Sequence, residues 1–553
     1  MSQAVRIAFL GGLGEIGRNC AVIEQSGRLV VLDCGVLFPN AEMPGVDLVL
    51  PDFSYLFDRR DDVDGIVLSH GHEDHVGAIA YLLREVKAPV YGSPFTLGIA
   101  RNRLDEANLT AEAELVAVAD GERRAIGPFD VEFIPVTHSV PYGFATAFHT
   151  AQGVILHSGD FKLDLKPVDG RRTDLARIGQ LASTEGIRLL LSDSTNAEEP
   201  GHTGSESSVG ESLLRIFETR AGRRIIVACF ASHVHRIQQL AVAALATKRR
   251  IALLGRSMIK NVGLARELGL LSIPDTALVD LEEIGKVPPG ELCILSTGSQ
   301  GEPMSALSLM ASGESRWLTI EDGDVVVLSS HAIPGNEWAV AKVMDGLARR
   351  GAEVIHAATD HVHESGHARQ GELATLLSVA RPRSFVPVHG EYRHLLRHSR
   401  LAIEMGVPPN DVLVCEDGDV VALTDEGIDF DGEVSSSYVF IDGIAGDVGM
   451  GVLRERRVLA EEGIVVAAVT LDRKSGVLVG QPVVVSRGFL DDEGHEELAA
   501  AARAAVVKAL EVAAAEGHPE PDAIRRLVRR TVGKMVNERT RRRPMIVPVV
   551  VER

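Results

Sequence analysis

The side chains best suited to chemistry lie in one histidine-rich stretch of the sequence, residues 69–77. Three histidines and an aspartate fall within six residues: His70, His72, Asp74 and His75. The stretch follows an apolar run at 65–68 and precedes a helical pattern at 76–83, which predicts a loop between a strand and a helix. Imidazole and carboxylate groups placed together in this way can bind metal ions. The alternative, a polar loop that is rich in histidine by chance, is less favoured.

Further residues of the same types follow other predicted strands. His138, Asp160, Asp193 and His389 come after apolar runs at 131–136, 153–157, 188–191 and 384–388. Because the ends of several strands can meet at one rim of a sheet sandwich, we expect these side chains to converge. The candidate metal ligands are therefore His70, His72, Asp74, His75, His138, Asp160 and His389.

Seven nitrogen and oxygen ligands without a cysteine are too many for one tetrahedral ion and suit two ions that share a carboxylate. One ion would be held by His70, His72 and His138, and the other by Asp74, His75 and His389. Asp160 would bridge the two ions. This ligand set suits two Zn²⁺ and also admits Mn²⁺.

Length and composition limit the class of protein. A chain of 553 residues, 45% of them hydrophobic, predicts more than one domain with sizeable cores. Five scattered cysteines without a C-x-x-C pair fit a reducing compartment, and we found no signal peptide and no apolar run long enough to span a membrane. We expect a soluble, cytoplasmic protein. A net charge of -20 argues against broad coating of nucleic acid, but it does not exclude a locally basic or metal-lined groove.

A glycine motif near the start of the chain invites a different interpretation. Residues 12–17 read G-x-G-x-x-G after a strand-like run, and Asp33 lies where a dinucleotide-binding fold places its acidic residue. That motif requires a helix to begin at the glycines, whereas residues 19–33 predict a β-hairpin with a turn at Ser26-Gly27. The glycines therefore predict a tight loop that borders the active site.

The pattern of elements predicts an inserted domain. Short strands with few helices run to about residue 204, helices alternate with apolar strands from about 205 to 347, and metal-type residues then return. We expect a first domain in two parts, 1–204 and 368–430, an inserted domain at 205–367, a linker at 431–450 and a small C-terminal α/β domain at 451–553. The last domain contains a basic helix. Its charged face could be solvated or could lie in an oligomer interface, and these alternatives are as plausible as a contact with RNA.

The motifs resemble those of the metallo-β-lactamase superfamily. Its H-x-H-x-D-H signature matches residues 70–75, and Asp33 matches an acid that supports the ligand loop. Asp193, His367 and His389 resemble three motifs of the β-CASP group, which processes nucleic acids. Within that group the stretches at 230–236 and 298–304 resemble the bacterial ribonuclease J family.

The resemblance implies a fold and an activity. The expected fold class is α/β: a metallo-β-lactamase αββα sandwich with an inserted β-CASP α/β domain and a small C-terminal α/β domain. The expected activity is that of a two-metal ribonuclease with 5′-to-3′ exonuclease action, a preference for 5′-monophosphate ends and endonuclease activity, in mRNA decay and rRNA maturation. Its partners would be single-stranded RNA, further copies of the chain in a dimer or tetramer, and components of an RNA-degradation complex.

The resemblance also suggests roles for individual residues. The catalytic candidates are Asp74, His367 and Asp193, with His367 as the acid; a structural hydrogen bond is the alternative role for His367. The residues expected to bind the substrate are Ser232, His235, His363, Glu364, Ser365, Gly366 and His367. Ser232 has the alternative of capping a helix.

The resemblance further suggests a structural Ca²⁺ that would involve Gly45, Asp47 and Asp442, where an ordinary turn-capping aspartate is equally plausible. Two other functions remain as rivals: a small-molecule hydrolase such as a thioesterase or lactonase, and an RNA scaffold with a decayed site. The inserted domain argues against the first rival, and the complete ligand set argues against the second.

Overall fold

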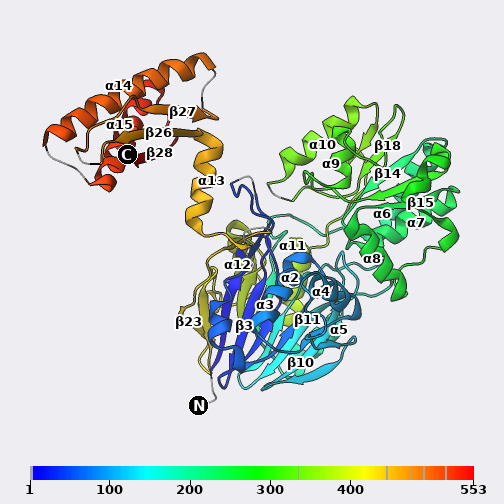
Figure 1. The fold of residues 1–553 in the computed structure, drawn as a ribbon. Coiled ribbons are helices and arrows are strands. Elements are labelled where there is room, and N and C mark those ends of the chain that lie inside the picture. Colours follow the sequence, from blue (N-terminus) through cyan, green and yellow to red (C-terminus); the bar gives the residue numbers. More distant parts are fainter. Residues whose placement is uncertain are drawn as a thin grey trace. The chain divides into compact units, whose positions relative to one another are not determined.

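The computed structural model describes residues 4–40, 42–333, 335–443, 446–473, 475–489, 492–516 and 520–553 (Figure 1). Two compact units share the chain. The first comprises Met1–Phe38 and Val49–Tyr438, and the second comprises Pro39–Leu48 and Val439–Arg553. No helix of the described residues is long and apolar enough to cross a bilayer.

Two stacked sheets form the larger part of the first unit. The eight-stranded sheet has the order β23 (Ile428–Glu433), β22 (Asp419–Leu423), β1 (Val5–Gly11), β3 (Cys20–Gln25), β4 (Arg28–Leu32), β6 (Val63–Val67), β7 (Val90–Gly92) and β8 (Leu115–Ala117). The six-stranded sheet has the order β20 (Ser384–Val388), β13 (Ile187–Asp193), β12 (Gly153–His157), β11 (Gly143–Thr150), β10 (Phe129–Val136) and β9 (Arg123–Ile126).

The core between these sheets is aliphatic and phenylalanine-rich, and it includes Ile7, Phe133 and Leu191. Helices cover the outer faces. On the second sheet α5 (Leu175–Thr184), α11 (Gln370–Ala380) and α12 (Tyr392–Glu404) bury Ile178, Leu376 and Leu401. On the first sheet α4 (Pro94–Glu106) contacts β7 and β8. The predicted αββα sandwich is confirmed.

The glycine motif leads into a hairpin, as predicted. β3 pairs antiparallel with β4, and Ser26 and Gly27 at the turn both have positive φ angles, of 57° and 75°. That combination is typical of the two-residue turns that match the twist of a hairpin. No helix begins at the glycines, so the dinucleotide-binding interpretation is excluded.

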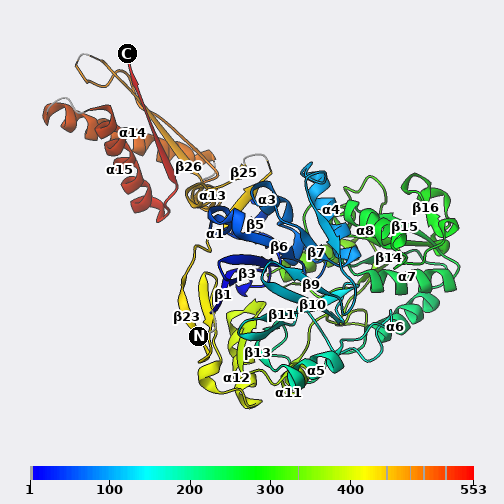
Figure 2. The ribbon, with the colours of Figure 1, turned by 90° about the horizontal axis from the view of Figure 1, so that it is seen from below.

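A third sheet belongs to the inserted segment. Its strands are all parallel and have the order β16 (Leu278–Val279), β15 (Arg250–Leu254), β17 (Leu292–Ser296), β14 (Ile225–Ala228), β18 (Val325–Leu328) and β19 (Glu353–Ile355). Figure 2 shows α6 (Glu206–Thr219), α7 (Val234–Ala246) and α8 (Arg256–Glu267) beside these strands. Two further helices, α9 (Ala306–Ser312) and α10 (Glu337–Arg349), belong to the same segment.

After this segment the chain returns to the second sheet of the sandwich. β20 pairs parallel with β13, so Val386 lies beside Leu191 although nearly two hundred residues separate them. An insertion between neighbouring strands of one sheet is what the sequence pattern predicts. The boundaries at 204/205 and 367/368 stay a prediction.

The second unit is a three-stranded sheet covered by two helices. β26 (Ile464–Leu471) lies between β27 (Val483–Arg487) and β28 (Met545–Glu552), and α14 (Asp492–Glu516) and α15 (Pro521–Thr540) pack on one face. β27 begins at Val483, directly after Pro482, and the preceding Gly476 and Gly480 have positive φ angles that do not suit a strand. The predicted linker at 431–450 carries β24 (Val439–Asp442) and β25 (Gly446–Asp447), and the helix α13 (Met450–Glu462) that follows was not predicted.

Candidate active site

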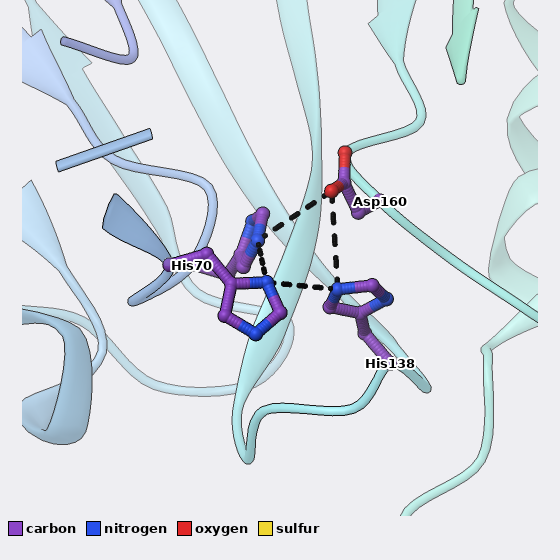
Figure 3. Close-up of side chains that lie close together, drawn as sticks. His70, His138 and Asp160 are labelled. Carbon is purple, nitrogen blue, oxygen red and sulfur yellow. Dashed lines mark hydrogen bonds and ion pairs between the residues drawn. The ribbon is translucent and has the colours of Figure 1, made fainter. Parts of the chain in front are cut away.

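Loops that leave four strands of the sandwich bring the predicted ligands together. The loop after β6 carries His70, His138 follows β10, Asp160 follows β12 and His389 follows β20. Figure 3 shows the side chains of His70, His138 and Asp160 directed toward one another. The seven predicted ligands divide into two groups that share Asp160, as the sequence suggests, and within each group the ligand atoms lie within 4.8 Å of one another.

The first group consists of His70, His72, His138 and Asp160. His72 Nδ1 lies 3.0 Å from His70 Nε2 and 3.1 Å from His138 Nε2. Three imidazole nitrogens therefore meet at one point. Because a neutral imidazole has only one N–H, three converging nitrogens suit a shared cation better than a set of hydrogen bonds among themselves.

The second group consists of Asp74, His75, His389 and Asp160. Asp160 Oδ2 lies 3.3 Å from His75 Nε2, 3.1 Å from His389 Nε2 and 3.6 Å from His70 Nε2. This oxygen is buried and makes no hydrogen bond of good geometry to any described residue. A buried carboxylate oxygen costs free energy unless it is paired, so the site fits divalent cations bound between the two groups.

The pKa shifts of the histidines differ between the two groups. Burial lowers the pKa of His70 and of His138 well below the usual value for histidine. Burial alone would raise the pKa of Asp160, but the facing imidazoles of His389 and His75 hold it well below the usual value. In the first group, neutral imidazoles beside an ionised carboxylate are the protonation states that a metal ion requires. In the second group burial would lower the pKa of His75 and of His389, but the charge of Asp160 raises both, so a metal ion bound there would displace protons.

Asp33 holds the ligand loop from behind. Its Oδ2 accepts hydrogen bonds from His75 Nδ1 and the Ser69 hydroxyl, both at 2.8 Å, and its Oδ1 accepts one from the Ser69 backbone N–H. Because His75 donates through Nδ1, its Nε2 is left facing Asp160. Asp33 itself adopts a positive φ of 61°, an uncommon conformation that is typical of positions where function requires it.

Asn19 is a supporting residue that the sequence interpretation missed. Its backbone N–H and its side-chain amide both donate to the carbonyl oxygen of Asp74 at 3.0 Å. The preceding Gly17 and Arg18 have positive φ angles, which bend the glycine loop back over the ligand loop. The predicted proximity of this loop to the active site supplied the only sequence signal for Asn19.

His367 and Asp193 lie next to the two metal-type groups. His367 Nδ1 donates to Asp193 Oδ2 at 2.8 Å. Burial by itself would lower the pKa of His367, but the charge of Asp193 and this hydrogen bond raise it to about 9. The His367 side chain is 20% exposed and that of Asp193 only 2%, so a substrate can reach the imidazole but not the carboxylate.

Gly366 contacts the cluster through its carbonyl group. His138 Nδ1 donates to this oxygen at 2.8 Å, which leaves His138 Nε2 directed at Asp160. The resemblance suggests that Gly366 binds substrate, which stays a prediction, and the structure adds that its carbonyl group orients a predicted ligand. A Cβ atom at this position would lie 2.6 Å from the His138 ring, so no other residue fits without a shift.

The other residues expected to bind substrate lie in two places, the loop at 363–367 and the start of α7. Ser365 Oγ accepts hydrogen bonds from Asn196 and from the His367 backbone, so it shapes the loop beside the cluster. Glu364 belongs to the same loop and approaches Gly204. Ser232 precedes α7, but His233 is the N-cap residue and makes no side-chain cap, so the capping alternative for Ser232 is not observed.

Two histidines complete the predicted pocket. His235 Nε2 lies 3.2 Å from Asp169 Oδ2, a partner that the sequence did not indicate. His363 is largely buried and meets the His331 ring edge-on, with its Nδ1 making no hydrogen bond to a described residue. Behind them the buried guanidinium of Arg236 is paired with Glu206 at 2.7 Å and fixes the start of α7.

The oxygens predicted to bind Ca²⁺ already contact a cation. Arg456 donates to the Asp442 carboxylate at 2.7 Å and to the Gly45 carbonyl at 3.0 Å, while Asp47 Oδ2 accepts from the Gly443 backbone N–H. These oxygens do not fit a Ca²⁺ site without displacement of the guanidinium. The predicted Ca²⁺ stays a prediction, and Arg456 competes with it.

Family models match four successive segments of the chain. They describe the metallo-beta-lactamase superfamily over residues 13–226, the ribonuclease J beta-CASP domain over 222–347, the Zn-dependent metallo-hydrolase RNA specificity domain over 353–414 and the ribonuclease J C-terminal domain over 451–553. A solved protein of unknown function from Enterococcus faecalis shares the fold, with a TM-score of 0.53 at 16% identity over 76% of this chain and 100% of its own.

Curated relatives match from end to end. Ribonuclease J of Mycolicibacterium smegmatis is 45% identical, covering 99% of this chain and 97% of the relative. Ribonuclease J2 of Bacillus subtilis is 37% identical, covering 100% and 99%. These identities over the whole length show that the chain belongs to the ribonuclease J family of metal-dependent ribonucleases, and its His and Asp clusters suit divalent metals.

Proposed function

We propose that this protein hydrolyses single-stranded RNA at a centre of two divalent ions, as a 5′-to-3′ exonuclease that prefers 5′-monophosphate ends and also cuts internally. We expect it to act in mRNA decay and rRNA maturation, and we propose a shared role with an RNA-degradation complex. The observation that carries the two-ion centre is the buried, unsatisfied oxygen of Asp160 between two groups of imidazoles.

Seven residues would hold the ions. His70, His72 and His138 face one position, Asp74, His75 and His389 face the other, and Asp160 lies between. Zn²⁺ and Mn²⁺ both suit this mixture of imidazole and carboxylate. Bound ions of this kind supply Lewis acidity, which lowers the pKa of a water molecule and neutralises charge on the scissile phosphodiester.

The residues around the centre would orient the reaction. Asp74 lies at the ligand loop, 3.7 Å from His389 Nε2, where its carboxylate can hold the attacking water in place. In the pair formed by His367 and Asp193, the His367 side chain is partly exposed and that of Asp193 is buried. We therefore assign to His367 the proton transfer to the leaving 3′ oxygen. Asp193 fixes the tautomer and direction of the His367 ring.

The preference for a 5′-monophosphate would come from the loop at 363–367 and the start of α7. Ser232, His235 and Ser365 carry the hydroxyl and imidazole groups that would meet the phosphate, and Gly366 connects this loop to His138. A pocket at a fixed distance from the ions favours stepwise removal of nucleotides from the 5′ end. Internal cutting requires the RNA to bypass the pocket.

We also propose that copies of the chain associate into a dimer or tetramer. The sheet of the second unit packs one face on α14 and α15, and its other face presents valines that are exposed in this chain, including Val483, Val485, Val549 and Val551. Contiguous apolar faces that are exposed in a single chain are typical of interaction sites. Light scattering coupled to size-exclusion chromatography measures the oligomer, and a monomer at all concentrations would exclude the proposal.

The central experiment compares end-labelled RNAs that carry a 5′-monophosphate, a 5′-triphosphate or a 5′-hydroxyl group. The wild-type protein should degrade the monophosphate RNA fastest, and His75→Ala should lose activity together with bound metal. A matched control is His361→Ala, because His361 is exposed and lies outside the cluster. Equal degradation by His75→Ala would exclude the metal mechanism, and indifference to the 5′ group would exclude the pocket.

A further inference from the structure

Positive charge is concentrated on α15 and the residues that follow it. Between residues 521 and 543 the sequence has nine arginines and lysines and two acids, a net charge of +7. The whole chain has a net charge of -20, so the remaining residues sum to -27. A local excess of this size in an acidic protein marks a surface for a negatively charged partner.

Packing of the helix presents these cations to solvent. Ile524, Val528, Val532 and Val536 are fully buried and anchor α15 in the core of the second unit. All nine cations are exposed: Arg525, Arg526, Arg529, Arg530, Lys534, Arg539, Arg541, Arg542 and Arg543. Arg526, Arg530 and Lys534 follow each other at intervals of four residues, a row with a spacing of roughly 6 Å along the helix.

Few of these charges are neutralised within the chain. Arg525 pairs with Asp522, and Lys534 lies 3.9 Å from Glu538. For Arg526, Arg529 and Arg530 the structure gives no acidic partner among the described residues. Because arginine keeps its charge at every physiological pH and its guanidinium binds phosphate through two N–H groups, the row suits a phosphodiester backbone.

We propose that this cationic face, formed by the nine residues named above, binds the RNA substrate at a site separate from the metal centre. The contact would be made to phosphates, without regard to base sequence, and would raise the affinity for long RNA. α15 contributes no residue to either metal-type group, so this contact acts on binding and not on the chemical step.

Two other partners fit the surface less well. Insertion into a membrane requires an apolar stripe beside the cations, and the apolar stripe of α15 is buried in the core. A symmetric contact between two copies of this face would bring like charges together, which is unfavourable. RNA is also the polyanion on which this family acts.

The test uses two variants: one removes two positive charges from α15, and the other removes two from the neighbouring helix α14. The variant R526Q/R530Q is compared with R503Q/K508Q, whose positions lie on α14 of the same unit. The probe is a long, unstructured RNA with phosphorothioate linkages, which keep the backbone charge and resist hydrolysis, bound to the full-length metal-loaded protein at several salt concentrations.

The expected result is quantitative. Loss of two phosphate contacts should lower the slope of log K against log salt by about 1.4, which corresponds to roughly 25-fold weaker binding near 0.1 M salt. The α14 variant should bind like the wild type, and both variants should hydrolyse a small chromogenic phosphodiester at the wild-type rate. Unchanged affinity and slope in R526Q/R530Q would overturn the proposal, as would equal losses in both variants or a loss that follows a change of oligomeric state.

Discussion

The imidazole of His367 donates a hydrogen bond to the carboxylate of Asp193 over 2.8 Å, although 174 positions separate the two residues. Asp193 ends the strand β13 of the sandwich, before the inserted segment, and His367 lies in the loop between β19, the last strand of that segment, and α11. The hydrogen bond therefore joins the two ends of the inserted segment beside the predicted metal ligands. A hydrogen bond at this point couples the placement of the loop at 363–367 to the rim of the sheet.

Substitution of Asp193 by asparagine tests whether this pair serves proton transfer. Asparagine preserves an acceptor for His367 Nδ1 but removes the charge that favours the imidazolium. We expect kcat to fall by about 10²-fold, at the lower end of the range for general acid catalysis, while metal content and RNA affinity stay unchanged. Single-turnover hydrolysis, elemental analysis and equilibrium binding measure the three quantities.

The control for Asp193→Asn is Asp61→Asn, a change at an exposed carboxylate that belongs to neither ligand group. It should leave all three quantities at the wild-type level. If Asp193→Asn lost metal in proportion to activity, Asp193 would be a metal ligand and not a partner for His367.

Substitution of Gly366 by alanine tests the contact between the loop and His138. The added methyl group would lie 2.6 Å from His138 Cε1, too close for any carbon contact, so the ring must move. We expect metal affinity to fall by about 10- to 100-fold, the range seen when groups that orient a ligand are disturbed. Gly263→Ala is the matched control, since a Cβ atom there meets nothing within 4 Å. Equal metal affinity in both variants would contradict the orienting role.

The sequence predicts much of the fold because local rules agree with the global structure. The turn at Ser26-Gly27, the run of buried strands at 225–328 and the return of β20 beside β13 each follow from hydrophobic patterning and turn chemistry. The helix α13 was missed since Gly449, Gly451 and the exposed Leu459 obscure its pattern, and only Leu453 in it is fully buried.

Contacts between distant loops were beyond prediction. Residue types and strand ends indicated which side chains converge, but not that Asp169 would face His235 or that Asn19 would hold Asp74. The pairing of buried Arg236 with Glu206 depends on how α6 packs against α7, which no local pattern encodes. For the same reason the family resemblance suggested oxygen ligands at Asp442 without indicating that Arg456 approaches this carboxylate.

Substitution of Arg456 by methionine tests which cation the second unit uses. Without the guanidinium, the Asp442 carboxylate and the Gly45 carbonyl lose their donor, at a cost of about 1–3 kcal/mol. We expect the melting temperature of the wild type to be the same in EGTA and in calcium, and that of Arg456→Met to be lower and to rise with calcium. Arg454→Met, at an exposed position of the same helix, is the control. Stabilisation of the wild type by calcium would show that the ion displaces Arg456.

The buried imidazole of His398 should make stability depend on pH. Burial, the main cause, lowers its pKa to about 3, and its Nδ1 lies 3.0 Å from the Ser194 hydroxyl while Nε2 has no partner among the described residues. In the unfolded chain the imidazole takes up a proton below about pH 6.5. The unfolded state therefore binds more protons than the native state between these values, and stability is lost as the pH falls through this window.

His398→Gln removes this dependence while it retains a donor for Ser194. The free energy of unfolding of the wild type, measured by chemical denaturation, should fall more steeply than that of the variant between about pH 7 and about pH 5, with a difference in slope of at most ~1.4 kcal/mol per pH unit. Loss of metal at lower pH affects both proteins and cancels in the comparison. His361→Gln, at an exposed histidine, should retain the wild-type slope. Parallel curves for wild type and His398→Gln would mean that the native protein accepts a proton at His398, which its surroundings between Phe385 and Ser194 argue against.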